Sequence, residues 1–505
     1  MKESIKCVLQ ILSPVHLGCD EVYEPTGFVL DEEAQQLVVF DPLSFLARMS
    51  KEEKESFFQI CSKGTISSIL EIFKLFQGKK ANGRAIDICP GLVEHYHKTL
   101  SIPLQDQSRI QQELNNFTMA RTAFLPSDER PYIPGSAIKG ALRTAYLNSL
   151  TASKKIPQES GKGASKKLEK SLLDGGEFAT DPFRMVKVSD FRPIGECKTR
   201  IVYAVNEKKV SSKFEAKGPY QILEVIEPGT QFEGAITVEE PERKAGIKSP
   251  ISLNRLLRSA VQFYTKEKDR EDGELSRIGI SGVSMPDKEN GFLVRLGRHS
   301  GAESITVNGY RSIKVMKGRG EKPAYENHAT TLWLASEVAK PTLKQNLRPF
   351  GWAVLRELAA ALAEELEVQE EAWRNEAESK RIESLAEKQN ELKTRREEQQ
   401  EMAQEAERRA SIEEQERKEA ERRKKELEAM TPEESDIALV RNPKTTENQV
   451  VEIYNRMDGF SEENKKTLAS AFRTYWEASG KWEKKQCTKK QWAKVQKIKG
   501  ILGER

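Results

Sequence analysis

The sequence is poor in the residues that build metal sites and disulfide scaffolds. Its 505 residues include six cysteines and five histidines, which are dispersed, and there is no C-x-x-C pair. This pattern argues against a zinc ribbon and against a disulfide framework. No apolar run reaches the roughly 18 to 20 residues that cross a bilayer. We therefore expect a soluble, cytoplasmic protein with no metal, no cofactor and no membrane partner.

The net charge is also small. Lys and Arg together number 82 against 78 for Asp and Glu, which gives a formal net charge of +4. Such a balance does not mark a nucleic-acid binder, so local basic clusters would have to meet any phosphates. Charged residues make up 32% of the chain and hydrophobic residues 37%. These values predict a highly charged segment attached to two or three folded units.

Most of the chain reads as a mixture of strands and helices. Short apolar or alternating runs over residues 1–352 predict strands between helices, without regular β-α-β repetition. We expect an α+β architecture of two related sheet-and-helix halves, at residues 1–195 and 196–352. Residues 150–172 are rich in Lys, Ser and Gly and predict a flexible insertion.

The next segment has the opposite character. Residues 353–430 contain no glycine or proline and are dense in Glu, Lys, Arg and Gln, which predicts a long charged helix. An apolar stripe from Trp352 to Leu366 predicts that the start of this helix docks on the globular part. Further on, the heptad rhythm fails at positions 396 and 399. A single solvated helix held by i,i+4 ion pairs and a coiled coil with a partner both stay open.

The last segment, residues 431–505, predicts a small helical module with tryptophans in its core. From Lys465 onward it carries twelve basic and three acidic residues. This imbalance fits the electrostatic footprint of a polyanion binder, and it fits equally the basic face of a small packing domain.

The strongest local pattern is YIPGSAIKGALRTA at residues 132–145. Pro134-Gly135 predicts a turn, and Ser136 predicts the N-cap of a helix. The same helix would bury one apolar face against a sheet and carry Lys139 and Arg143, spaced i,i+4, on a second face.

Two residues of this helix reduce its stability. Lys139 lies in the first turn, where the helix dipole disfavours a cation, and Gly140 takes a place where alanine favours the helix. Both are explained if an anionic backbone approaches this helix end, because free amides, Lys139 and Arg143 would meet a phosphate and Gly140 would permit close contact. A surface helix with ordinary basic residues and a packing glycine stays open.

Two weaker patterns lie near the ends of the globular part. In LGRHSG (residues 296–301), glycines flank Arg298 and His299, so the backbone can curve around a ligand and present amides to phosphate; a plain β-loop fits as well. In SPVHLG (residues 13–18), His16 is a candidate catalytic base, although a histidine in a loop is more often a capping or stacking residue.

These three segments, in this order, resemble the RAMP superfamily of CRISPR proteins. That family typically opens with a strand and an S/T-P-x-H-x-G-like turn, carries a central I-P-G-S-S-x-K-G-x-x-R segment and ends with a glycine-rich loop. The opening SPVHLGCDEVYEPTGFVLDEEAQQLVVFDP is similar to that of the fifth subunit of type III-A (Csm) effector complexes, as are residues 181–191 and 226–236. The resemblance covers about residues 1–352.

The resemblance implies tandem RRM-like (ferredoxin-like) modules with insertions and a non-catalytic RNA-binding subunit. Such a subunit caps the 3′-end side of the guide RNA (crRNA) and aids crRNA maturation in antiviral defence. The implied partners are crRNA, target RNA indirectly, neighbouring type III effector subunits and host nucleases. RNA binding is carried over to Gly135, Ser136, Lys139, Gly140, Arg143, Gly297, Arg298, His299, Gly301 and His16. These residues would contact phosphates and sugars rather than read bases.

Three alternatives stay open. Some RAMP relatives are metal-independent endoribonucleases that use a histidine base, and His16 or His299 would take that role here. The chain could also be a scaffold whose working part is the long helix, or a different type III end subunit, either III-B or 5′-handle-binding. Neither the target-cleaving aspartate of a backbone subunit nor the G-G-D-D motif of the large subunit can be matched in this sequence.

Overall fold

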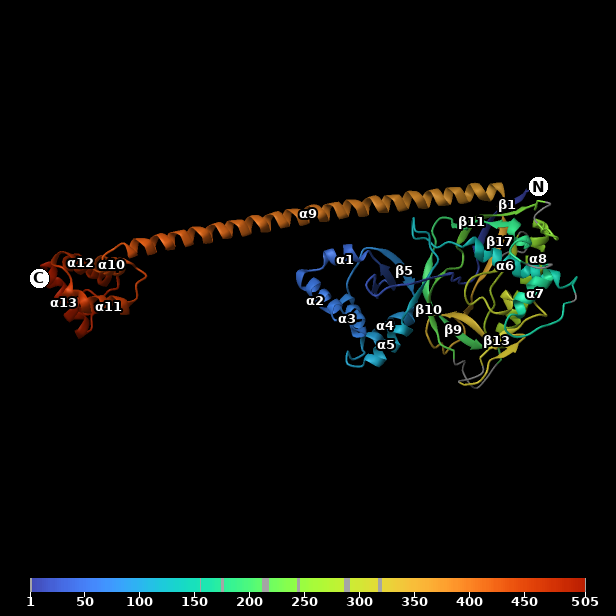
Figure 1. The fold of residues 1–505 in the computed structure, drawn as a ribbon, viewed down its shortest axis with the longest axis horizontal. Helices are drawn as coiled ribbons and strands as arrows, with labels where there is room; N and C mark the ends of the chain where they lie inside the picture. The colour runs from blue at the N-terminus through green and yellow to red at the C-terminus, as the bar shows by residue number, and fades with distance from the viewer. Residues whose placement is uncertain are drawn as a thin grey trace. The chain divides into compact units, whose positions relative to one another are not determined.

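The computed structural model describes residues 2–154, 156–173, 177–210, 218–242, 246–285, 291–316 and 320–504. The chain divides into two units, Met1–Ser379 and Lys380–Arg505. Among the described residues, the first unit contains all the strands together with helices α1 to α8 and the start of α9, which confirms the α+β class. Figure 1 shows these elements in chain order.

The strands lie in two main sheets and a short hairpin. Their bounds are β1 (Lys2–Ile11), β2 (Gly18–Val22), β3 (Phe28–Asp31), β4 (Gln36–Val39), β5 (Arg84–Ile88), β6 (Met119–Thr122), β7 (Val186–Val188), β8 (Arg192–Pro193), β9 (Thr199–Lys208), β10 (Gln221–Ile226), β11 (Gln231–Glu239), β12 (Phe292–Arg295), β13 (Ile313–Val315), β14 (Ala324–Glu326), β15 (Thr331–Ser336), β16 (Arg348–Pro349) and β17 (Trp352–Glu357).

The helices fall before, between and after these strands. Their bounds are α1 (Pro42–Arg48), α2 (Lys51–Ser62), α3 (Ile66–Phe76), α4 (Pro90–Leu100), α5 (Gln107–Asn116), α6 (Gly135–Leu150), α7 (Ala164–Leu172), α8 (Leu253–Arg277), α9 (Ala360–Glu428), α10 (Pro432–Arg441), α11 (Glu447–Arg456), α12 (Glu462–Ala478) and α13 (Lys489–Leu502). None of the helices in the described part of the chain is both long enough and apolar enough to cross a bilayer.

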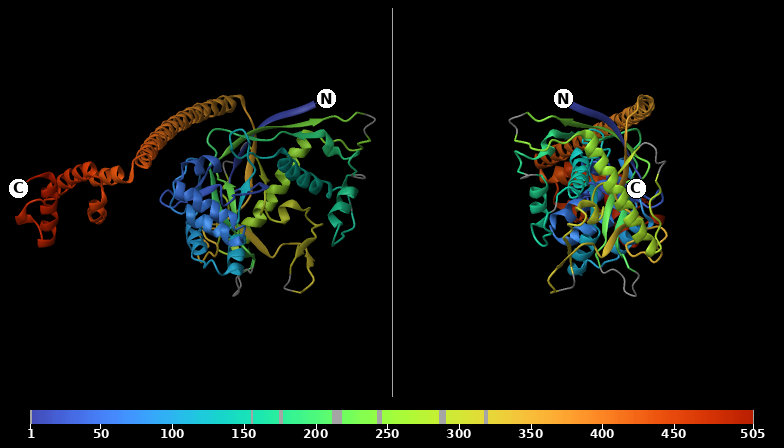
Figure 2. Two further views of the ribbon diagram at one scale, coloured as in Figure 1. Left: turned by 60° about the vertical axis from the view of Figure 1, so that its left-hand side comes forward. Right: turned by 90° about the vertical axis from the view of Figure 1, so that its right-hand side faces the viewer.

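The first sheet has the strand order β12-β17-β1-β11-β7, with β8 also paired to β11, and every pairing is antiparallel. The period of two in β1 sends Cys7, Leu9 and Ile11 into the core that α6 and α8 cover, and Val8 toward the opposite face. Figure 2 shows β1, in dark blue, running beside the green β11.

The chain order of this sheet is β1, α6, β7, β11, α8, β17, a β-α-β-β-α-β sequence. Of the six strands of this sheet, β1, β7 and β8 precede residue 195, and β11, β12 and β17 follow it. The expected boundary between two halves therefore falls inside one sheet, because β1 pairs with both β11 and β17.

The second sheet has the order β2-β6-β10-β9-β5-β4-β3, and β15 and β16 extend it beside β9. Its β6–β10 and β5–β9 pairs are parallel, and the other pairs are antiparallel. Helices α3, α4 and α5 cover one face through an apolar core. The other face carries a small apolar cluster around Phe350, with Trp333 at its margin, and a second cluster at β3 and β4 that packs Val29 against α1, α2 and α3.

A buried carboxylate ties the strands of the second sheet together. Glu224 on β10 is fully buried and accepts hydrogen bonds from the Tyr23 hydroxyl at 2.8 Å and the Thr122 amide at 3.1 Å, and it forms an ion pair with Arg84. Burial and the Glu224 charge raise the pKa of Tyr23, so this phenol stays a neutral donor. A buried charge is tolerated only with partners of this kind.

A second buried network surrounds the last turns of α8. Glu271 accepts from Arg295 at 2.6 Å and from the Trp352 indole at 2.6 Å, which joins α8 to β12 and β17. Further ion pairs connect α8 to the end of β9 and to the segment after β12. They are Lys209–Glu274, Lys209–Glu303, Arg311–Glu267, Arg270–Glu267 and Arg270–Glu274. The sequence pattern predicts a helix over residues 249–267. Helix α8 runs ten residues beyond that end, because charged side chains that suggest a solvated end are paired inside the protein.

Three local predictions need correction. Residues 352–357 form strand β17 rather than the start of the charged helix, because Trp352 and Leu355 are buried in the first sheet. The segment predicted as a flexible insertion contains α7, which buries Ala164 and Leu172. The sequence pattern over residues 291–309 predicts a strand, a glycine-punctuated loop and a second strand, but residues 303–305 form a 3₁₀ turn.

The first turns of α9 belong to the first unit. Leu362 and Leu366 pack on the open face of the first sheet, beside Val8 and Ile194. Arg130 fixes the helix there, since its guanidinium makes two hydrogen bonds to Glu370, at 2.9 and 3.0 Å, and lies 3.5 Å from the centre of the Trp373 ring.

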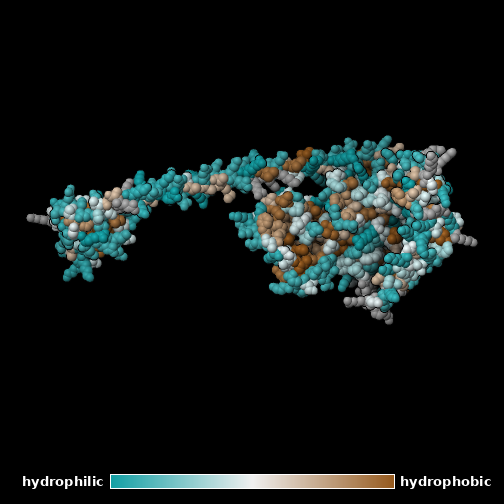
Figure 3. Space-filling model, in the orientation of Figure 1, coloured by the Kyte–Doolittle hydropathy of each residue, from teal (hydrophilic) through white to brown (hydrophobic). Residues whose placement is uncertain are grey.

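The second unit contains the rest of α9 and a four-helix module. In this part of α9 the described side chains are exposed, with i,i+4 pairs such as Lys418–Glu414, and Figure 3 shows a mainly hydrophilic surface there. Helices α10 to α13 enclose a core that includes Phe472 and Trp476, as the tryptophan-rich sequence predicted.

Candidate nucleic-acid interface

The structure brings the two outer sequence patterns together. The SPVHLG turn follows β1 and the LGRHSG loop follows β12, and the amide of Arg298 donates to the main-chain oxygen of His16 at 2.8 Å. Gly297 has φ +79°, and a Cβ at this position would lie 2.4 Å from the same oxygen. Only glycine allows this approach, so the contact explains the glycine before Arg298.

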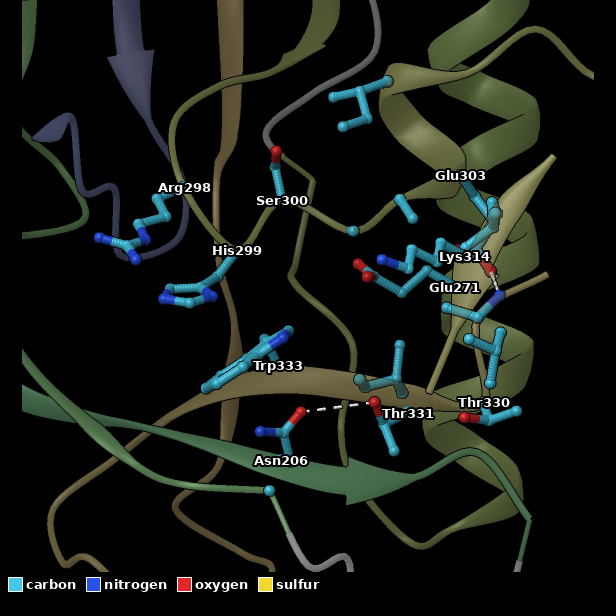
Figure 4. Close-up of a pocket in the computed structure, with 18 of the residues that line it drawn as sticks. Asn206, Glu271, Arg298, His299, Ser300, Glu303, Lys314, Thr330, Thr331 and Trp333 are labelled. Atoms are coloured by element: carbon cyan, nitrogen blue, oxygen red, sulfur yellow. Dashed lines mark hydrogen bonds between the residues drawn. The ribbon is translucent and has the colours of Figure 1, made fainter. Parts of the chain in front are cut away.

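A cavity of about 890 Å³ opens beside this loop. Its walls come from the loop after β12, from β13 and from the exposed face of β15, and Figure 4 shows His299 above Trp333 on one side. Arg298 and Lys314 are exposed at this cavity, and neither side chain forms an ion pair or hydrogen bond with the described residues. The cavity thus combines two free cations with an aromatic surface.

His299 presents a ring face rather than a charge. Its backbone has φ +66°, an uncommon conformation for a residue with a side chain, and its Nε2 donates to Gln221 Oε1 at 3.1 Å. The ring lies 4.2 Å from Trp333 and is tilted by 35°. Burial, followed by the charges of Arg298 and His16, lowers its pKa to about 3. A neutral ring over an indole suits stacking against a base.

The side chain of His16 is out of reach of a ligand in this structure. It is 0% exposed, and its Nδ1 donates to the main-chain oxygen of Glu224 at 2.7 Å. Its Nε2 is buried without a hydrogen-bond partner, and burial lowers the pKa of the ring. His16 therefore holds the turn under the loop, with its main-chain oxygen as the contact to Arg298.

The central pattern forms the start of α6, but its caps differ from the prediction. The helix begins at Gly135 with Pro134 in the N-cap position, so Ser136 is not the N-cap. Asp190 takes that role from another segment, because its Oδ1 accepts from the Gly135 amide at 2.8 Å. A Cβ on Gly135 would lie 2.4 Å from Val188 O, which explains this glycine by packing.

The two cations of this helix have different environments. Arg143 is paired with Glu169 at 3.0 Å and with Asp181 at 2.8 Å, so both ends of its guanidinium are occupied. Lys139 forms no ion pair with the described residues. Burial and then the neighbouring charge of Lys187 lower its pKa.

Gly140 and Lys187 add to the exposed surface around Lys139. A Cβ at Gly140 would have no described atom within 4 Å, so none of the described residues packs against this glycine. Lys187 is exposed and, like Lys139, forms no ion pair with the described residues. An anion at this surface would offset the repulsion between the two lysines.

The predicted site residues thus lie in two places. The first place is one loop over His16, which holds Gly297, Arg298, His299 and Gly301. The second place is α6, which holds Gly135, Ser136, Lys139, Gly140 and Arg143. Helix α6 lines neither this cavity nor a second one that lies beside the first turns of α9. Sequence reasoning missed Trp333 and Lys314. The alternation of β15 could have indicated Trp333, because Leu332 and Leu334 on either side of it are buried.

The arrangement offers no metal chemistry that the described residues can support. No group of three or more His, Cys, Asp or Glu side chains in the described ranges could hold a metal ion. The described groups suited to a ligand here are cations, glycine-rich backbone and aromatic rings, which match a sugar–phosphate chain with unstacked bases.

Comparisons with known proteins bear on the family and the fold. No curated protein matches the chain. A chain in a cryo-EM structure of a Csm–crRNA–target RNA ternary complex of a type III-A CRISPR-Cas system is 17% identical with a TM-score of 0.46, over 70% of this chain and 100% of that one. Csm5 of T. onnurineus is 17% identical with a TM-score of 0.37, over 69% and 99%. Likeness of this size does not by itself identify a function.

The family match is more extensive. The model of the RAMP superfamily covers residues 8–279, which include the turn after β1, the whole of α6 and strands β2 to β11. Since this is more than half of the sequence, the chain belongs to the RAMP superfamily.

Proposed function

We propose that this protein is a non-catalytic RNA-binding subunit of a type III-A CRISPR effector complex, at the 3′-end side of the crRNA. Membership of the RAMP superfamily supports the RNA-binding class, and the opening of the sequence supports the type of subunit. The order β17-β1-β11-β7 with α6 and α8 further supports an RRM-like module. Its direct partners are crRNA and neighbouring effector subunits in the cytoplasm, and it meets target RNA through the crRNA. Host nucleases would trim the 3′ end of the crRNA.

One observation carries the proposal: two cations without a partner among the described residues and a close, tilted pair of aromatic rings line the same cavity. Arg298 and Lys314 can each meet a phosphate, and the His299–Trp333 pair offers a surface on which a base of any sequence can stack. Backbone contact with stacking is the sequence-tolerant mode of single-strand binding, and a guide-binding protein must accept many sequences.

The same geometry favours binding over cleavage. A general base must reach the proton that it removes, and the side chain of His16 is fully buried. His299 is accessible at the cavity, but its Nε2 is already a donor to Gln221 and its pKa is lowered to about 3. Neither histidine is placed to activate a ribose hydroxyl, so the endoribonuclease alternative has the weaker support.

The direct test is binding of a fluorescent single-stranded RNA to the full chain, measured by anisotropy over a range of salt concentrations. The double variant Arg298→Glu/Lys314→Glu should bind about tenfold or more weakly. Its slope of log K against log salt should be smaller by about 1.4, because two phosphate contacts are lost at about 0.7 each. Trp333→Ala should weaken binding with little change in that slope.

The matched control is Lys51→Glu/Lys80→Glu, which makes the same change in net charge at two exposed positions outside the cavity. If this control and the cavity variant bind RNA equally, the assignment of RNA binding to the cavity is wrong.

The position in the complex is tested by purifying the assembled complex with and without this chain and sizing the crRNA. Loss of the chain should leave longer or ragged 3′ ends, and an unchanged size distribution would contradict the maturation role.

A further inference from the structure

The four-helix module at the end of the chain has strongly segregated charge. Residues 431–463 contain eight acidic and three basic side chains, whereas residues 464–504 contain eleven basic and three acidic ones. The basic half holds α12 and α13 and the segment between them. The module therefore has a polarity that the small net charge of the whole chain conceals.

The positive charge is densest where α13 begins. Lys484, Lys485, Lys489 and Lys490 lie within seven residues that contain no acidic side chain, and all four are exposed. None of them forms an ion pair or hydrogen bond through its side chain with the described residues. We call these four residues the α13 cluster. Lysines further along the chain differ, since Lys497 is paired with Asp458 and Lys481 with Glu447.

Two forces oppose such a cluster in the folded protein. The four like charges repel one another, and the amino end of α13 carries the positive end of the helix dipole, which disfavours cations. Thr488 caps this helix end, because its hydroxyl accepts from the Gln491 amide, so the helix needs no lysine there. An external polyanion removes both penalties.

The surroundings of the cluster distinguish between kinds of partner. Between residues 431 and 504, none of the large hydrophobic side chains is classed as exposed, in contrast to the first unit and α9. A protein partner normally needs an apolar centre and few lysines, and an amphipathic membrane anchor inserts apolar side chains. Trp482 and Trp492 are half-buried, and Lys499 lies over both rings, at 5.7 and 5.9 Å. Dense lysine without an apolar centre fits the phosphate backbone of a nucleic acid.

We propose that the module of residues 431–504 is a second, sequence-independent nucleic-acid-binding site that contacts a phosphate backbone through Lys484, Lys485, Lys489 and Lys490. This site goes beyond the proposed function, because it lies in a different unit and shares no residue with the cavity beside the LGRHSG loop. Both RNA and DNA carry this backbone, so the test includes each.

The test uses the full chain and a variant in which the four lysines are changed to glutamate. The probes are a labelled 30-nucleotide single-stranded RNA and a labelled 30-base-pair DNA duplex, titrated at several salt concentrations. For the RNA, the variant should bind about tenfold or more weakly, with a slope of log K against log salt that is smaller by about 3. Ultraviolet crosslinking with peptide mapping should place part of the wild-type crosslinks within residues 481–499.

The matched control changes Lys51, Lys80, Lys248 and Lys340 to glutamate, which alters the net charge equally at exposed positions outside the module. A second variant with four glutamines at the cluster separates loss of contact from new repulsion, and far-ultraviolet circular dichroism checks the helical content of each. The proposal is overturned if the cluster variants and the control bind both probes alike and no crosslink maps to the module. A loss confined to one probe identifies which nucleic acid the module takes.

Binding at the α13 cluster can be tested separately from binding at the cavity in the first unit. A chain with Arg298→Glu/Lys314→Glu and an intact α13 cluster should keep residual, salt-sensitive binding, and adding the four cluster changes should abolish it. If the cavity variant alone abolishes all binding, the second site is absent while the proposed function stands.

Discussion

The amide of Arg298 donates a hydrogen bond to the main-chain oxygen of His16, and this contact joins the first and last motifs of the globular sequence. It brings Arg298, whose guanidinium has no partner among the described residues, to the wall of the cavity beside His299. The motif histidine therefore acts through its backbone, while its buried ring keeps the turn in place through the main-chain oxygen of Glu224.

Two glycines should respond in opposite ways to alanine. Gly297→Ala places a methyl group 2.4 Å from His16 O at a positive φ, so we expect a loss of about 1–3 kcal/mol in unfolding free energy and weaker RNA binding. Gly140→Ala has open space and a helical position, so it should stabilise the chain by about 1 kcal/mol. Urea unfolding followed by tryptophan fluorescence measures both changes.

The RNA affinity of Gly140→Ala provides a separate test of α6. If an RNA backbone approaches Gly140 closely, this variant should bind RNA more weakly even though it is more stable. Equal affinity for the variant and the wild type would remove α6 from the RNA interface.

Substitutions of the two cations of α6 should affect unfolding free energy and RNA affinity differently. Arg143→Gln breaks the pairs with Glu169 and Asp181, and we expect it to lower the unfolding free energy by about 1–2 kcal/mol with little effect on RNA affinity at low temperature. Lys139→Gln should do the reverse, because this lysine has no partner among the described residues. Parallel melting curves and RNA titrations distinguish the two, and a strong affinity loss from Arg143→Gln alone would contradict this assignment.

The buried network around α8 should be sensitive to the loss of one charge. Glu271→Gln leaves the Arg295 guanidinium, which is 3% exposed, without a counter-charge, and we expect a loss of about 3–5 kcal/mol. The double change Glu271→Met/Arg295→Met should cost less than Glu271→Gln. Glu414→Gln, in the exposed α9 pair with Lys418, is the control and should stay within about 0.5 kcal/mol. Chemical denaturation gives all three values.

Mild acid should destabilise the first unit through His299. The pKa of this ring is lowered to about 3 in the folded protein, whereas it is about 6.5 in the unfolded chain. Between these values the unfolded state binds the proton and the folded state does not, so stability is complete above pH 6.5 and falls as the pH decreases. Each pH unit below 6.5 costs about 1.4 kcal/mol for this group.

The measurement compares unfolding free energies at pH 7.5 and 5.5. His299→Gln should reduce the difference between these two values, since glutamine does not titrate. The same change at the exposed His328 is the control and should leave the difference unaltered. An equal pH dependence for wild type and His299→Gln would show that His299 is not the titrating group.

Features of this structure that depend on contacts between residues close in sequence could be predicted from the sequence, and those that depend on distant residues could not. Local periodicity and turn residues predict a hairpin at residues 27–40, strands at 199–206, 220–226 and 231–239, and a helix after Pro134-Gly135. The structure has β3–β4, β9 to β11 and α6 near these positions. The RAMP motifs likewise identified the family, because they are short and continuous.

What the sequence did not reveal depends on partners that are distant along the chain. Arg143 looks like a free cation until Asp181 and Glu169 fold beside it. Ser136 looks like an N-cap, but Asp190 from another segment takes its place. The acidic end of α8 looks solvated until Arg295 and Lys209 pair with it. No local pattern indicates which of many charges will find a counter-charge.

The position of β1 between β11 and β17 has a consequence for the making of this protein. While the ribosome is still adding the first three hundred or so residues, the opening strand has neither its last neighbour nor a closed sheet to lie in. Its apolar side chains then depend on holdase chaperones or on transient clusters, and the sheet can close only after residue 357 has left the exit tunnel. A nascent chain arrested just before that point should therefore be sensitive to protease, and one released just after it should be resistant.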